Sequence, residues 1–168
     1  SNLLSTIYDG TGPWVTLTSG VPFPTNAAFS VTATFTEVVA GLMDTEIAVV
    51  NGTISNFIDV SGDVYTFDVT PVADGIVDVS IPAGVCEDQA TNGNAVSNLL
   101  RTIYDGTGPW VTLTSGVPFP TNAAFSVTAT FTEVGAGLMY TEIAGVNGTI
   151  STLIHISGDA YPVEREPV

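Results

Sequence analysis

The sequence predicts an all-β chain made of two tandem β-sandwiches, of which the second is incomplete. Alternating apolar and polar residues recur along the chain, turn signals rich in Gly and Asn separate these runs, and no segment keeps a helical period. Near-identical stretches also return with a period of 96 residues: SNLLSTIYDGTGPW from Ser1 comes back as SNLLRTIYDGTGPW from Ser97. A unit of this length has the size of one small domain.

Seven strands are expected in the first unit. The alternation is clearest in FSVTATFT, where Phe29 and Val31 share one face and Ser30 and Thr32 share the other. The Asn51-Gly52 pair between two such runs predicts a tight hairpin. Short strands joined by tight turns are typical of a sandwich. The expected strands are residues 14–18, 29–35, 46–50, 53–60, 64–70, 76–81 and a last one within 95–104.

The repeat sets the expected domain bounds. Residues 9–104 form the first sandwich, residues 105–168 form a second, truncated one, and residues 1–8 are a closing strand of a preceding or neighbouring unit. In the second copy the last two strands are expected to be missing and the fifth to be damaged, because Pro162 removes a ladder donor and Arg165 stands where the first copy has Val69.

Two explanations of this arrangement stay open. The chain is a stretch of a longer array, or the leading strand of one chain completes the open sandwich of the next and builds a head-to-tail filament. An exposed sheet edge beside a missing strand favours such pairing. The residues expected to make the donated contact are Leu3, Leu4, Ile7 and Tyr8.

Several runs in the sequence resemble a known family. FTEVV, VNGTISNF and VTPVADGIVDVSIPAG resemble the bacterial immunoglobulin-like domains that are repeated in large cell-surface and secreted adhesins. The resemblance covers nearly the whole chain and implies an immunoglobulin-like sandwich, a secreted or cell-surface location and no particular ligand. The expected function is an extracellular stalk or fibre subunit; the alternative is an adhesin module that recognises a glycan or a host protein through its loops.

The charge restricts the partners. Seventeen acidic residues face two basic ones, with no Lys, giving a net charge of −15. Nucleic acid is not an expected partner, because phosphate binding needs cations on the protein. Membrane insertion is not expected either, since no apolar run approaches the roughly 20 residues that span a bilayer. Self-association with neighbouring subunits or repeats is the expected partnership. Either bound divalent cations or a salty medium offset the charge, or the charge serves solubility.

Carboxylates in the turns suggest a calcium site. In a sandwich, the start of the first strand and the loops after the second, fourth and sixth strands meet at one pole, and Ca²⁺ takes six to eight oxygen ligands. Ca²⁺ is therefore the one cofactor expected, although Asp and Asn also suit solvated turns. The candidate ligands are Asp9, Glu37, Asp63, Glu87, Asp88, Asn92 and Asn94 in the first copy and Asp105, Glu133 and Asp159 in the second.

Other side chains give weaker signals. Asn51 and Asn147 each begin an Asn-Gly-Thr sequence, which fits N-glycosylation and equally fits a tight turn. Cys86 stands alone, so it is a buried thiol, an interchain partner or a reactive thiol. His155 is the single histidine and the first copy has Asp59 in its place, so no catalytic set can be assembled and no enzymatic activity is expected.

Overall fold

The computed structural model describes residues 3–117, 120–134, 138–145, 148–153 and 160–167 of the chain. The chain divides into two compact units, Ser1–Thr107 (unit 1) and Gly108–Val168 (unit 2). The division falls at Gly108 rather than at the expected Asp105, because Asp74 of unit 1 accepts hydrogen bonds from the Gly106 amide (2.7 Å) and the Thr107 hydroxyl. The described residues contain no helix with the length and apolar character needed to cross a bilayer.

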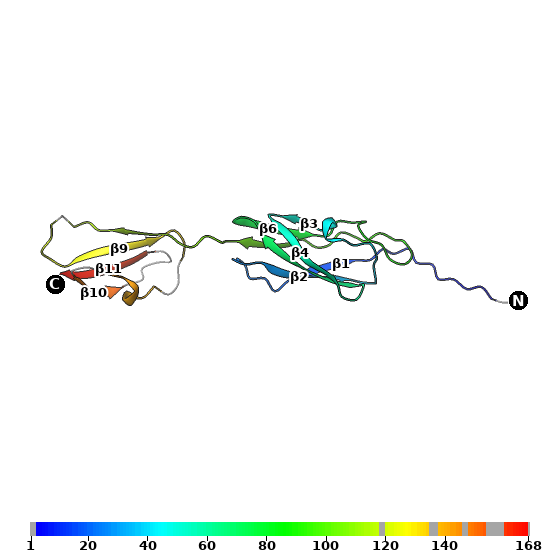
Figure 1. The fold of residues 1–168 in the computed structure, drawn as a ribbon, viewed down its shortest axis with the longest axis horizontal. Coiled ribbons are helices and arrows are strands. Elements are labelled where there is room, and N and C mark those ends of the chain that lie inside the picture. The colour runs from blue at the N-terminus through cyan, green and yellow to red at the C-terminus, as the bar shows by residue number, and fades with distance from the viewer. Residues whose placement is uncertain (1–2, 118–119, 135–137, 146–147, 154–159, 168) are drawn as a thin grey trace. The chain divides into compact units, whose positions relative to one another are not determined.

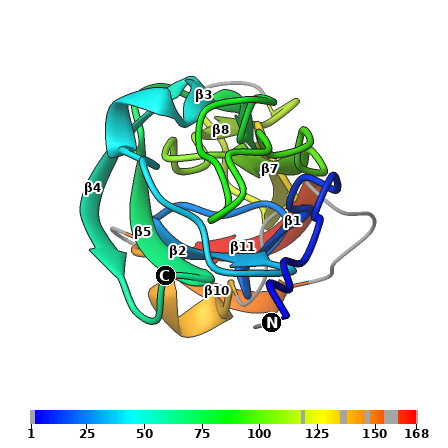
Figure 2. The same ribbon diagram turned by 90° about the vertical axis from the view of Figure 1, so that its right-hand side faces the viewer.

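Unit 1 is a sandwich of two antiparallel sheets (Figures 1 and 2). One sheet has the order β1-β2-β5-β4 and the other the order β3-β6-β7. This is the division of seven strands found in constant-type immunoglobulin domains. Figure 2 shows β4, β5, β2 and β1 following one another across the first sheet. The strands are β1 (Val15–Thr18), β2 (Phe29–Phe35), β3 (Ala48–Val50), β4 (Gly52–Asp59), β5 (Val64–Pro71), β6 (Gly75–Ser80) and β7 (Leu100–Tyr104).

The core of unit 1 follows from the alternation in the sequence. Side chains of one face of each strand turn inward, so Val31, Phe67 and Val77 are at most 1% exposed. Phe35 and Tyr65 meet edge to face, with ring centroids 5.8 Å apart. Full burial of an apolar side chain of this size stabilises the fold by about 1.5–3 kcal/mol. The contact between the two sheets is therefore what holds unit 1 together.

The third strand of unit 1 is shorter than expected. It begins at Ala48 instead of Glu46, because Asp44–Glu46 forms a 3₁₀ turn, η1. The Glu46 carboxylate accepts a hydrogen bond from the Met43 amide at 2.9 Å and so keeps this residue in the turn.

Unit 2 consists, in the residues that are described, of one antiparallel sheet with the order β8-β9-β11-β10. Its register repeats that of unit 1: Val111 faces Phe131 as Val15 faces Phe35. The expected third strand is not formed by residues 144–145, since its counterpart β3 pairs with β6 and no equivalent of β6 is described in unit 2. The strands are β8 (Val111–Thr114), β9 (Phe125–Phe131), β10 (Gly148–Leu153) and β11 (Ala160–Pro167).

The expectation of a damaged fifth strand in the second copy is wrong. β11 runs over eight residues and pairs with β9 on one side and with β10 on the other. Arg165 takes the register position that Val69 has in unit 1, and Pro162 lies within the ladder opposite Thr128. One lost amide donor leaves the remaining backbone hydrogen bonds of the strand in place.

Candidate functional site

Three carboxylates meet at one pole of unit 1. Asp9, Glu37 and Asp88 place carboxylate oxygens within 4.8 Å of one another, and we call them the acidic group. Asp9 precedes β1, Glu37 follows β2, and Asp88 lies in the loop after β6. The sandwich topology brings these segments to the same end of the unit, as the sequence predicts.

The loop after β6 is fixed against the segment that leads into β1. Asp88 is 6% exposed, and its two oxygens accept hydrogen bonds from the backbone and side-chain nitrogens of Asn92, each at 2.9 Å. The Asn92 side chain also donates to the Asp9 carbonyl at 3.3 Å. Gly12 lies so close to Gly93 that a Cβ there would collide with the Gly93 carbonyl oxygen. Asp9 is therefore presented beside Asp88.

The environment shifts the pKa values of Glu37 and Asp88 in opposite directions. Desolvation, followed by the negative charges of Asp88 and Asp9, raises the pKa of Glu37. Hydrogen bonds from the side chain and backbone of Asn92 lower the pKa of Asp88. Asp88 is thus held as a carboxylate while its charge opposes the ionisation of Glu37. A bound cation would relieve this repulsion.

Of the other predicted ligands of the first copy, Asn92 bonds to the acidic group through its two nitrogen atoms, whereas Asn94, Asp63 and Glu87 are used elsewhere. Asn94 is 3% exposed and structural: its oxygen accepts from the amides of Val85 (2.9 Å) and Cys86 (3.0 Å), and its nitrogen donates to two carbonyls. The Asp63 carboxylate accepts from the Ser61 hydroxyl at 2.6 Å within its own turn. Glu87 pairs through its backbone with Ala40 and Gly93.

The remaining predicted positions are used locally or lie outside the described residues. Asp105 accepts a hydrogen bond from the Thr107 amide at 3.3 Å, and Glu133 is half-buried just after β9. Asn51 closes the turn before β4, with its side-chain amide bonded to the nitrogen (3.1 Å) and oxygen (2.6 Å) of Ala73. Asp159 and Asn147 belong to the part of the chain that is not described.

The leading segment, residues 1–8, is exposed where it is described. The side chains of Leu3, Leu4, Ile7 and Tyr8 are 92–97% exposed, and the segment runs clear of the sandwich (Figure 1). Its copy, residues 97–104, contains β7 and is built into unit 1. The same eight-residue pattern is therefore docked in one place and free in another.

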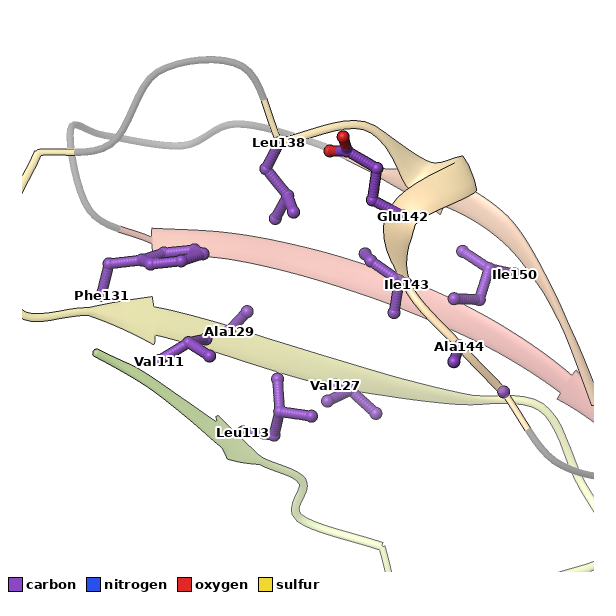
Figure 3. Close-up of a pocket in the computed structure, with 11 residues that line it drawn as sticks. Val111, Leu113, Val127, Ala129, Phe131, Leu138, Glu142, Ile143, Ala144 and Ile150 are labelled. Atoms are coloured by element: carbon purple, nitrogen blue, oxygen red, sulfur yellow. The ribbon is translucent and has the colours of Figure 1, made fainter. Parts of the chain in front are cut away.

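Unit 2 presents an open apolar groove of about 390 Å³ on the inner face of its sheet. Figure 3 shows Leu113 of β8, Val127 and Phe131 of β9, and Leu138 and Ile143 beside the 3₁₀ turn η2 (Tyr140–Glu142) turned toward the same space. In unit 1 the corresponding face is the one covered by the second sheet.

Comparison with protein families identifies the fold. The model of the bacterial Ig-like domain matches residues 9–103. The chain belongs to this family. The match coincides with the closed sandwich of unit 1 and confirms the resemblance drawn from the sequence. No curated protein matches this Ig-like chain.

Among solved structures, the Ig-like chain is similar to the adhesin InvE of Yersinia pseudotuberculosis, with 13% sequence identity and a TM-score of 0.35. The alignment covers 92% of this chain and 51% of that chain, so the present chain spans about half of the length of the InvE structure.

The open groove of this Ig-like chain was not predicted from the sequence. The exposed strand was expected, but the surface lined by Leu113, Val127 and Ile143 was not. The signal was present, because VTLT and FSVTATF occur in both copies and must give both sheets the same apolar face.

Proposed function

We propose that this Ig-like chain is an extracellular structural repeat protein that forms a stalk or head-to-tail fibre, in which residues 1–8 of one subunit complete unit 2 of the next. One observation carries the proposal: a segment that is docked in unit 1 recurs exposed at the front, while unit 2 has an uncovered apolar face. The family, with its members in surface and secreted adhesins, supports an extracellular location.

The physical basis is strand addition. An added strand gains hydrogen bonds to exposed backbone groups beside the groove and buries alternate side chains in it. The donor and acceptor surfaces are different, so each contact leaves one free donor and one free acceptor, and growth continues as an open filament as long as the rotation between subunits does not close a ring.

The test compares the full chain with one that lacks residues 1–8, using sedimentation velocity over a concentration series and negative-stain microscopy. The full chain is expected to form elongated species that grow with concentration, and the deletion variant is expected to stay monomeric. A variant with residues 1–8 replaced by a Gly/Ser segment of equal length controls for chain length. Equal assembly of all three would disprove strand donation.

The acidic group enters this proposal as a Ca²⁺ site. Its three carboxylates supply part of the six to eight oxygens that Ca²⁺ takes, and water or backbone oxygens would supply the rest. Calorimetric titration with Ca²⁺ is expected to show saturable binding that Asp88→Asn removes. Asp63→Asn is the matched control, because Asp63 bonds within its own turn. Absence of binding to the unmodified chain would rule the site out.

A binding module remains the second candidate, because Trp14 and Trp110 are 66% and 74% exposed. Exposed indole rings form platforms on which sugar rings stack. Specific glycan-array signals that Trp14→Ala abolishes, given by a chain that stays monomeric, would favour this function over the fibre.

A further inference from the structure

We infer that the donated strand enters unit 2 in the register of β7, with Leu4, Thr6 and Tyr8 turned toward the open groove, and that it docks on the β8 side of unit 2. The occupant is residues 1–9 of a second copy of this chain. This inference rests on the proposed function and defines the contact that builds the fibre.

β7 turns one of its two faces toward the core of unit 1. Leu100 and Tyr104 pack against the core of unit 1, and Thr102 is 2% exposed. Leu99, on the opposite face, is 54% exposed. The 96-residue period transfers the inward face to Leu4, Thr6 and Tyr8 and the outward face to Leu3.

Residues in and beside β7 form hydrogen bonds with β1 and with the loop after it. The Asn98 side chain accepts from the Leu17 amide at 2.7 Å and donates to the Leu17 carbonyl at 3.1 Å. The Thr25 amide donates to the Ile103 carbonyl, and the Asp105 amide donates to the Thr25 carbonyl, both at 2.9 Å. These bonds reach β1 and the loop after it and do not involve β6. A strand with this sequence therefore has hydrogen-bond partners in β1 and the loop after it, in addition to β6.

Leu17 and Thr25, which bond to the β7 segment in unit 1, have counterparts in unit 2. The counterparts of the receiving residues are Leu113, which is 62% exposed, and Thr121, which is also exposed. The donated strand is expected to bond through the Ile7 carbonyl and the Asp9 amide to the backbone of Thr121. Asn2 stands in the sequence where Asn98 does.

The two copies of the strand, residues 1–8 and 97–104, differ at a single position. SNLLSTIY and SNLLRTIY differ only at Ser5, which corresponds to Arg101. The Arg101 side chain reaches β6: its Nε and Nη2 atoms bond the two carboxylate oxygens of Asp78, each at 2.7 Å. The exposed copy thus keeps the residues that bond to β1 and to the loop after it, and it lacks the one side chain that forms an ion pair with β6, although β7 also pairs with β6 along its backbone.

The test uses two variants that differ only in the face of the strand. Leu4→Asp places a charge in the groove, and Leu3→Asp places the same charge on the outer face. Both sites lie on an exposed segment, so unit 1 folds in either case. Assembly is measured by sedimentation velocity, and a labelled peptide of residues 1–9 is titrated into the chain lacking residues 1–8 by fluorescence anisotropy. We expect Leu4→Asp to abolish assembly and to weaken peptide binding about tenfold or more, because a buried unpaired charge is costly. Leu3→Asp should retain both.

The outcomes separate the inference from the proposed function. Assembly and peptide binding that respond equally to the two variants would refute the register and leave strand donation standing. A peptide that does not bind the shortened chain, together with a monomeric full chain, would refute both. Peptide binding by the shortened chain, with a full chain that is monomeric and binds no peptide, would assign the groove to the chain's own leading segment instead of a second copy.

Discussion

β1 and β8 have the same sequence, VTLT, and pair with their neighbouring strands in the same register, yet their burial differs. Val15 and Leu17 are 6% and 2% exposed, whereas Val111 and Leu113 are 52% and 62% exposed. Neither local sequence nor the ladder accounts for this difference. It comes from the opposite layer, because β3, β6 and β7 cover the inner face in unit 1. Burial in a sandwich is thus a property of the pair of sheets.

The largest expected effect comes from truncating the same residue in both strands. In the chain lacking residues 1–8, Leu17→Ala should lower the free energy of unfolding of unit 1 by about 2–5 kcal/mol, since it removes fully buried atoms. Leu113→Ala should change the stability of unit 2 by less than about 0.5 kcal/mol. Urea unfolding followed by the fluorescence of Trp14, or of Trp110, with the other changed to Phe, reports each unit separately. Equal losses would show that unit 2 has a closed core.

The next effect concerns a buried amide that closes the pole of unit 1. Asn94→Ala leaves the amides of Val85 and Cys86 without their acceptor, which should cost about 1–3 kcal/mol. Burial raises the pKa of the Cys86 thiol to about 11, so the native thiol should react slowly with a disulfide reagent at pH 8. Asn94→Ala should speed this reaction, and the exposed Asn26→Ala should not. An unchanged rate would mean that Asn94 does not hold this loop.

The strands of unit 1 were predictable because period-two alternation is a direct consequence of the pleat. The 3₁₀ turn at Asp44–Glu46 was not, since it depends on one carboxylate reaching back to the Met43 amide. Topology also predicted that Asp9, Glu37 and Asp88 converge. It could not predict that Asp63 turns toward Ser61, because side-chain direction within a turn depends on local hydrogen bonds.

The contrast between the two units was the hardest feature to obtain from the sequence. Identical runs give identical strand predictions, so VTLT is assigned the same inward face in both copies. Whether that face is covered depends on strands far away in the chain, which no local pattern contains. The fifth strand of the second copy was wrongly predicted to be damaged, because Pro162 and Arg165 were judged without the neighbouring strands. Backbone pairing with both β9 and β10 is what forms β11.

A smaller effect is expected when the two copies of the strand are made identical. Arg101→Ser turns residues 97–104 into the exposed sequence and removes the ion pair with Asp78, which lies on the surface. Arg101 lowers the pKa of Asp78, so its contribution is present above the usual Asp range and is lost as pH falls through the folded pKa. Thermal unfolding should show a small fall in Tm at pH 7 that disappears in acid. A large fall would mean that a strand with Ser at this position cannot dock, which would argue against donation of residues 1–8.

The smallest expected effect comes from neutralising one carboxylate of the acidic group, Glu37, and comparing it with its counterpart in unit 2, Glu133. The fold raises the pKa of Glu37, so its ionised form is destabilising above that pKa, and the penalty fades as pH falls through it. Glu37→Gln should therefore raise Tm slightly at pH 7 in the presence of EDTA, with a gain that vanishes in acid. Glu133→Gln removes the matching charge of the second copy and is the control variant. Excess Ca²⁺ should reverse the sign for Glu37→Gln alone, because the variant loses a ligand that the metal stabilises. A gain that persists unchanged with Ca²⁺ would mean that the repulsion in the acidic group is not relieved by this metal.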